Sequence, residues 1–205
     1  AIVIAVVGVY LNLSKLQQVA ITGMQVGNIS INITQQTTIT LVDDACEFGS
    51  GYVTAPYSYA LVYFNGTSYG TANWTIGSAP RPPGIIVRND GNVNLYVCVT
   101  SGKDKAGFFG GGTADRQFYG FWSTEKETGA CNGGNVPFDI PKEVSNSTYE
   151  AKHICIDSYL YTLHPQDEAD EVYVNCYLKI SDDTPPGDKT DTWTFTAQTE
   201  PCLLA

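Results

Sequence analysis

The chain has 205 residues, and its 11 Lys and Arg stand against 21 Asp and Glu, which gives a formal net charge of −10 at pH 7. The few basic residues do not form a cluster, so we expect no nucleic-acid binding, which needs a basic surface for the phosphates. Thirteen Tyr, three Trp, twenty Gly and ten Pro, set among short β-branched runs, are typical of an all-β domain on an outer surface.

Residues 1–22 are predicted to form one helix. Residues 1–11 (AIVIAVVGVYL) are apolar without interruption, and the first charge is Lys15. The apolar residues that follow fall close to the spacing of one helical face, and Gly23 offers a left-handed cap. The residues expected to mediate assembly through this helix are Ile2, Ile4, Val6, Val9, Leu11, Leu13, Leu16 and Val19.

Three interpretations compete for this helix. A secretory signal peptide begins with methionine and basic residues, which this segment lacks. A membrane anchor needs about 20 apolar residues, although the stripe after residue 11 extends the apolar surface at a membrane interface. In the third interpretation, which we favour, the helices of many copies pack together and shield one another from water, so that the chain meets the membrane only before assembly.

Residues 23–205 are predicted to form one domain, so the expected fold is mainly β: an immunoglobulin-like β-sandwich preceded by a single N-terminal hydrophobic α-helix. Asn28 to Val42 alternates apolar and polar residues, as a half-buried strand does. Turn signals such as Asn65-Gly66 separate the runs, residues 107–113 (GFFGGGT) are predicted to be a loop, and no second helical pattern is evident. Further strands are predicted at Tyr59 to Phe64, Asn73 to Ile76, Gly84 to Asn89, Val93 to Thr100, Gln117 to Trp122, His153 to Ile156, Val172 to Ile180 and Thr192 to Ala197.

The six cysteines are predicted to form disulfides. They contain no C-x-x-C pair and have no histidine at a ligand spacing, which argues against zinc, and an even count fits disulfides in an exported chain. Six cysteines allow fifteen connectivities. We predict Cys131 with Cys155, closing a long loop, and Cys46 with Cys202, tying the first strand to the last. That leaves Cys98 and Cys176 either as a bridge across the sheets or as two buried free thiols.

Six N-x-S/T sequons indicate a glycosylated, extracellular surface. The sequon at Asn12 is expected to stay empty, because a glycan there would not fit among packed helices. The candidates for N-linked glycans are Asn28, Asn32, Asn65, Asn73 and Asn146.

We expect no catalytic residue, no cofactor and no bound metal. The two histidines, His153 and His164, are predicted to be structural or on the surface. Residues 66–70 (GTSYG) match the nucleophile-elbow pattern, but they lie between two predicted strands, whereas the elbow needs a strand followed by a helix. The acidic residues within 167–171 and 182–188 match no calcium-loop spacing and are interpreted as solvated loop charges.

Several segments in order resemble secreted archaeal surface proteins that carry one immunoglobulin-like β-sandwich behind an N-terminal hydrophobic segment. They are residues 21–23 (ITG), 47–51 (EFGSG), 87–94 (VRNDGNVN), the Cys131 and Cys155 pair, and 179–197, which includes DTPPG and TFTA. The arrangement is similar to archaeal type IV pilins and archaellins, whose N-terminal helices bundle into a filament core while the β heads face solvent. The resemblance implies a non-enzymatic subunit of an extracellular, cell-surface filament, a helical homopolymer of identical subunits.

Three alternatives stay open. In a TasA-like or bundling-pilus subunit, Gln25 to Ile39 would be a strand donated to the neighbour's sheet. A lipid-anchored surface adhesin would use the same apolar segment as its anchor. A carbohydrate-binding module would stack Trp74, Trp122 and Tyr119 on sugar rings.

Overall fold

The computed structural model describes residues 34–132, 142–144, 152–155, 162–163, 165 and 168–202. Contacts divide the chain into two units, Ala1–Thr34 and Gln35–Ala205, and the description here concerns the second. The predicted helix over residues 1–22, its eight assembly residues and the sequons at Asn12, Asn28, Asn32 and Asn146 lie outside the described residues.

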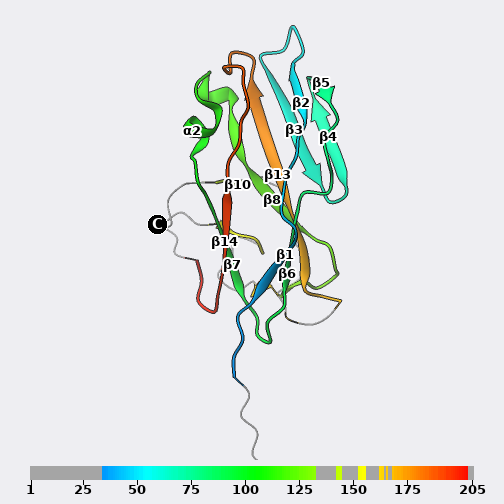
Figure 1. Cartoon of the computed structure of the whole chain (residues 1–205), viewed down its shortest axis with the longest axis vertical. Coiled ribbons are helices and arrows are strands. Elements are labelled where there is room, and N and C mark those ends of the chain that lie inside the picture. Colours follow the sequence, from blue (N-terminus) through cyan, green and yellow to red (C-terminus); the bar gives the residue numbers. More distant parts are fainter. Residues whose placement is uncertain are drawn as a thin grey trace, which may run out of the picture. The chain divides into compact units, whose positions relative to one another are not determined.

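The largest sheet is organised around the long strand β13, Glu171–Ser181 (Figure 1). One edge of β13 pairs with β8, Phe118–Glu125. The other edge is shared, because the first part of β13 pairs with β6, Ile85–Asn89, and the last part with β3, Tyr59–Asn65. All these pairings are antiparallel. The outer strands are β1 (Ile39–Asp43) beside β6, β4 (Ser68–Ala72) beside β3, and β10 (Lys142–Glu143) beside β8.

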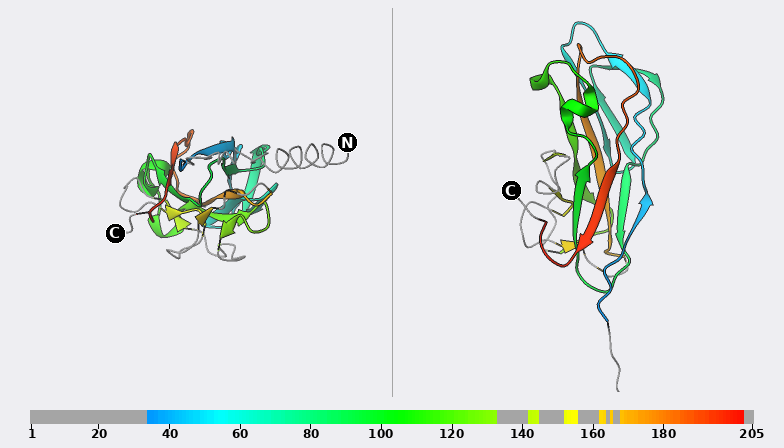
Figure 2. Two further views of the ribbon diagram at one scale, coloured as in Figure 1. Left: turned by 90° about the horizontal axis from the view of Figure 1, so that it is seen from below. Right: turned by 60° about the vertical axis from the view of Figure 1, so that its left-hand side comes forward.

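Three smaller antiparallel sheets complete the strand pairing among the described residues. In the three-stranded sheet, β7 (Tyr96–Ser101) lies between β11 (Lys152–His153) and β14 (Trp193–Gln198) (Figure 2). The two-stranded sheets pair β12 (Thr162–Leu163) with β9 (Cys131–Asn132), and β2 (Ser50–Val53) with β5 (Trp74–Ser78).

One hydrophobic cluster contains residues of both the largest sheet and the three-stranded sheet. In β3 the buried residues are Ala60, Val62 and Phe64, and the residues between them face away from the core, as the two-residue period of a strand requires. The other strands and α2 (Lys105–Phe109) contribute Ile85, Val87, Val97, Val99, Phe108, Phe109, Phe121, Val172 and Val174.

The predicted mainly-β fold is confirmed, and its sheets are antiparallel, but the expectation of a single helix, at the N-terminus, is wrong. Helix α2 begins two residues before the stretch 107–113 that was predicted to be a loop and includes its first three residues, and a 3-10 turn, Ala114–Arg116, follows it. The side chain of Asp104 caps α2 by accepting a hydrogen bond from the N–H of Gly107 (2.7 Å), and Gly110 ends it with φ 70°. A helix of five residues is too short to give a periodic pattern in the sequence.

Candidate interaction and modification surfaces

All six cysteines are paired, as Cys46–Cys176, Cys98–Cys202 and Cys131–Cys155. The predicted Cys131–Cys155 bridge is therefore confirmed. The predicted Cys46–Cys202 bridge is wrong, and so are both alternatives for Cys98 and Cys176, which neither bridge each other nor stay free.

The sheet arrangement explains the two corrected pairings. Cys176 lies in the main hydrophobic cluster at the point on β13 where pairing passes from β6 to β3. A Cβ on Gly84 would lie 3.3 Å from the Sγ of Cys46, so the missing side chain at Gly84 makes room for this bridge. Cys98 belongs instead to a separate buried cluster with Cys202. Cys98 lies in β7, and Cys202 follows β14, the strand that pairs with β7.

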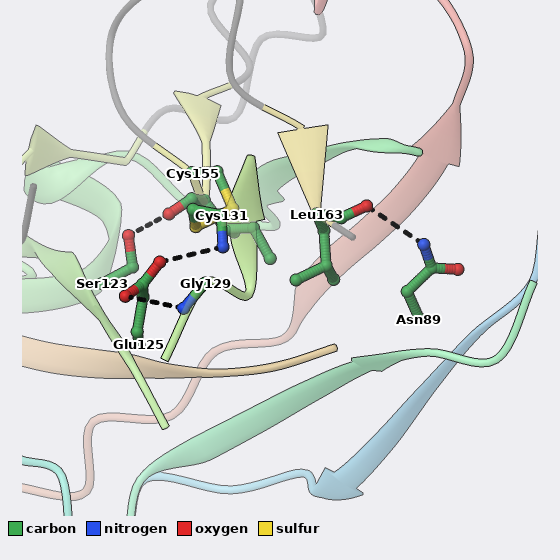
Figure 3. Close-up of a disulfide and its surroundings, with 8 residues drawn as sticks. Asn89, Ser123, Glu125, Gly129, Cys131, Cys155 and Leu163 are labelled. Carbon is green, nitrogen blue, oxygen red and sulfur yellow. Dashed lines mark hydrogen bonds between the residues drawn. A yellow bond between two sulfur atoms is a disulfide. The ribbon is translucent and has the colours of Figure 1, made fainter. Parts of the chain in front are cut away.

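Hydrogen bonds from side chains to the backbone surround the Cys131–Cys155 bridge (Figure 3). The carboxylate of Glu125 accepts the N–H of Cys131 at 3.1 Å, and the buried hydroxyl of Ser123 donates to the carbonyl of Ile154. Both acceptor and donor come from β8, so the bridge and its flanking segments are fixed to the largest sheet.

A buried charged cluster lies where β13 begins. The carboxylate of Glu127 accepts the backbone N–H groups of Asp170 and Glu171 at 3.0 and 3.1 Å. Glu171 forms ion pairs with Lys126 and with Arg88, the latter at 3.6 Å. Burial, together with the hydrogen bond to Glu127, raises the pKa of Asp170 to about 6.

The interpretation of residues 167–171 as solvated loop charges is therefore wrong for two of them. Asp170 is 7% exposed and Glu171 is 6% exposed. Burying two ionised carboxyl groups is costly unless they are paired. Here the raised pKa of Asp170 favours its neutral form, and two cations, Lys126 and Arg88, balance the charge of Glu171. Among the described residues, no three His, Cys, Asp or Glu side chains are arranged to hold a metal ion.

The largest sheet carries a row of contacting aromatic rings on the face opposite the core, called here the aromatic face. Tyr63 lies 5.4 Å from Trp122 and 6.0 Å from Tyr177, measured between ring centroids, and Tyr177 lies 5.5 Å from Phe118. A Cβ on Gly70 would overlap the ring of Tyr63, so this ring lies across the glycine of the neighbouring strand β4. The aromatic face consists of Tyr59, Tyr63, Phe118, Trp122 and Tyr177.

Only one of the three aromatics proposed for sugar stacking lies on this face. Trp122 belongs to it, but Tyr119 is 4% exposed and donates a hydrogen bond to Asp191 at 2.7 Å. Trp74 packs against the main hydrophobic cluster. Tyr63 and Tyr177 were not among the predicted candidates, although their alternate positions within two predicted strands were the available signal.

The two sequons that the structure describes, at Asn65 and Asn73, differ in their surroundings. Asn65 is the exposed last residue of β3 and pairs with Ser68, so the two-residue hairpin loop is Gly66-Thr67, not Asn65-Gly66 as the turn signal indicated. Gly66 has φ 57°, which suits the first position of a type II′ turn. No hydrogen bond joins the Asn65 side chain to any residue that the structure describes.

The sequon at Asn73 is engaged by its surroundings. The side-chain amide of Asn73 donates to the backbone carbonyl of Tyr59 at 3.3 Å, and the backbone carbonyl of Asn73 accepts the N–H of Thr54 at 2.8 Å. The hydroxyl of Thr75, the third residue of the sequon, is 2.8 Å from that of Thr54.

The remaining predicted positions carry no additional site. His153 lies in β11 opposite Cys98, and His164 falls outside the described residues. Residues 66–70 form the β3–β4 hairpin, which is not the strand-to-helix turn of a nucleophile elbow. Within the part of the chain that the structure describes, no helix has the length and apolar character needed to cross a membrane.

Comparison of the chain with known protein families, with curated proteins and with solved structures finds no match.

Proposed function

We propose that the chain is a non-enzymatic, structural subunit of an extracellular filament of the archaeal pilus type. Identical subunits form a helical homopolymer through their predicted N-terminal helices, and the β domain forms the outer sheath. The observation that carries the proposal is that one chain combines the uncharged apolar run of residues 1–11 with a β domain closed by three disulfides.

The disulfides support the extracellular part of the proposal. Disulfides form and persist in oxidising compartments and are rare in the cytosol, where thiols are kept reduced. All six cysteines are used, and the bridges connect segments that are up to 130 residues apart in the sequence. A head exposed outside the cell, beyond the reach of chaperones, gains stability from such bridges.

The sheet arrangement supports an immunoglobulin-like β-sandwich as the head. Two antiparallel sheets share one hydrophobic cluster, as the two layers of a sandwich do. In this proposal the core faces of β3, β8 and β13 meet β7 and β14, and the aromatic face is directed away from the second layer.

The physical basis of assembly is the burial of the apolar helices. If each helix removes about 1,000 Å² of apolar surface from water, about 25 kcal/mol of hydrophobic free energy is gained before the cost of association is subtracted. In this proposal successive copies contact one another through different surfaces, and such contacts produce a filament when the rotation between copies does not close into a ring.

Electron microscopy of native material, sheared from cells without detergent and reconstructed with helical symmetry, tests the proposal. We expect residues 1–22 as helices bundled along the filament axis. If residues 25–39 instead run as a strand into the next subunit's sheet, the subunits assemble by strand donation and not by helix packing. The absence of any filament, with extraction requiring detergent, would overturn the proposal in favour of a lipid-anchored adhesin.

A further inference from the structure

We infer that Asn65 carries an N-linked glycan whose first sugar packs on Tyr63, at the edge of the aromatic face, whereas Asn73 stays unmodified. The inference rests on the extracellular part of the proposed function, because N-glycosylation occurs on exported chains. It does not depend on whether the exported protein forms a filament.

The first step is access to the two sequons. Asn65 is exposed at the end of a strand, and Thr67, whose hydroxyl completes the sequon, is exposed in the hairpin loop. At Asn73 the amide nitrogen that would carry the sugar already donates to the carbonyl of Tyr59, and the hydroxyl of Thr75 contacts Thr54. A glycan would replace one of the two amide hydrogens of Asn73 and would have to fit beside the carbonyl of Tyr59, whereas the side chain of Asn65 is exposed, so the folded domain favours modification at Asn65.

The second step is the direction in which the glycan points. Because Gly66-Thr67 forms the loop, Asn65 remains in β3, and side chains two residues apart on a strand point to the same face. Asn65 therefore stands on the face that Tyr63 occupies, about 6.6–6.8 Å away along the strand. A sugar on the amide of Asn65 starts beside this ring.

The third step is the chemistry of the surface that the sugar meets. The ring of Tyr63 is half-buried, lies across Gly70 and contacts Trp122 at 5.4 Å. A ring held in this way keeps a fixed apolar surface beside the hairpin. The C–H groups of a pyranose ring pack on an aromatic surface while its hydroxyl groups stay in water, so the glycan covers apolar surface that the sheet leaves open.

Mass spectrometry of peptides from the native full-length protein tests where the glycan is attached. We expect the peptide that contains Asn65 to carry a glycan and the peptide that contains Asn73 to be unmodified. An unmodified Asn65, or a modified Asn73, overturns the inference. A modified Asn65 in cells that make no filament would contradict the proposed function and leave this inference standing.

A double-mutant cycle in the native host tests the contact with Tyr63. We expect Asn65→Gln to lower Tm by about 2–4 °C, the shift for losing one aromatic contact in a chain of this size. The same change in a Tyr63→Val background should lower Tm by much less, because the sugar has then lost its ring. Thr67→Ala, which removes the sequon but keeps Asn65, should reproduce the result of Asn65→Gln.

Tyr59→Val is the matched control for the cycle. Tyr59 lies on the same strand and the same face, at the other end of β3, where Lys179 lies 4.5 Å above its ring. The effect of Asn65→Gln should be as large in this background as in the wild type. Equal effects of Asn65→Gln in the Tyr63→Val and Tyr59→Val backgrounds would overturn the packing on Tyr63.

Discussion

At the scale of single residues, the start of β13 shows how buried charge is tolerated. Asp170 and Glu171 are neighbours in the sequence and are both buried, but their charges are balanced differently. Glu171 is paired with Lys126 and Arg88, whereas the pKa of Asp170 is raised to about 6 by burial and by its hydrogen bond to Glu127. Burial alone would raise the pKa of Glu127, but the N–H groups of Asp170 and Glu171 and the charge of Lys126 outweigh this effect, so the pKa of Glu127 is lowered.

Asp170→Asn is expected to change how stability depends on pH. The pKa of Asp170 is about 6 in the folded protein and about 3.9 in an unfolded chain. Its contribution to stability is therefore complete below about pH 4 and is lost as the pH rises through 6. Asn keeps the shape without the charge, so the variant should melt higher than wild type at about pH 7 and equally at about pH 4, as measured by circular dichroism.

Asp115→Asn is the control for this change. Asp115 is exposed, so its replacement should leave the dependence of Tm on pH as it is in the wild type. An Asp170→Asn variant with the same pH profile as wild type would show that Asp170 is not protonated near pH 6 in the folded protein.

At the scale of the elements, close backbone approach explains why β10 lies beside β8. Gly120 of β8 pairs with Glu143, and a Cβ at Gly120 would overlap the backbone carbonyl of Lys142. A backbone atom cannot rotate away as a side chain does, so this glycine is required for the pairing.

Gly120→Ala is expected to lower the free energy of unfolding by about 1–3 kcal/mol, the range for overpacking. Gly77→Ala is the matched control, because the atom nearest to its added methyl group is the side-chain hydroxyl of Ser50, which can rotate away. Denaturant unfolding of both variants checks the difference. A loss of stability at Gly77 as large as at Gly120 would contradict this account.

The elements also show what the sequence can reveal. Strands β3 and β13 were predicted because Tyr59 to Phe64 and Val172 to Ile180 are rich in β-branched and aromatic residues and turn signals separate such runs. Strand β4 was missed, since its sequence SYGTA is small and polar and it pairs only with β3 among the described strands. Of the candidate sites, Asn65 and Trp122 were found by motif and residue type, whereas the aromatic face depends on strand register, which the sequence does not contain.

At the scale of the whole molecule, the disulfides join segments that are distant in the sequence. Cys46–Cys176 spans 130 residues and Cys131–Cys155 spans 24. Such separations also explain why only the short-range bridge was predicted correctly. Cys131 and Cys155 are close enough in the sequence to be paired as the two ends of one loop, whereas the other two pairings depend on how the sheets are packed.

Removing Cys46–Cys176 should cost more stability than removing Cys131–Cys155. In the chain-entropy account the cost grows with loop length, to about 5 kcal/mol for the longer loop and about 3.5 kcal/mol for the shorter one. Denaturant unfolding of C46A/C176A and C131A/C155A, compared with wild type, measures both. The reverse order would mean that native packing, not loop length, sets the effect.

The proposed assembly predicts a separation between folding and polymerisation. Val6→Asp, or Ile4→Lys, should abolish filaments, because an unpaired charge among packed apolar helices is costly. The β domain should still fold, with its three disulfides intact by mass spectrometry and an unchanged near-UV circular dichroism spectrum. Filaments that persist in either variant would rule out the helix core and favour strand donation.

The Cys46–Cys176 bridge also has a mechanical consequence. Tension on the segment before Gln36 would load the edge strand β1, which can be peeled from β6 one residue pair at a time. Peeling must stop at Cys46, because this residue is covalently tied to β13. The segment that can be freed therefore has about ten residues and is at most about 35 Å long when fully extended. We expect the bridge to limit unfolding under tension to the residues before Cys46, and single-molecule pulling that releases a longer step with the bridge intact would contradict this.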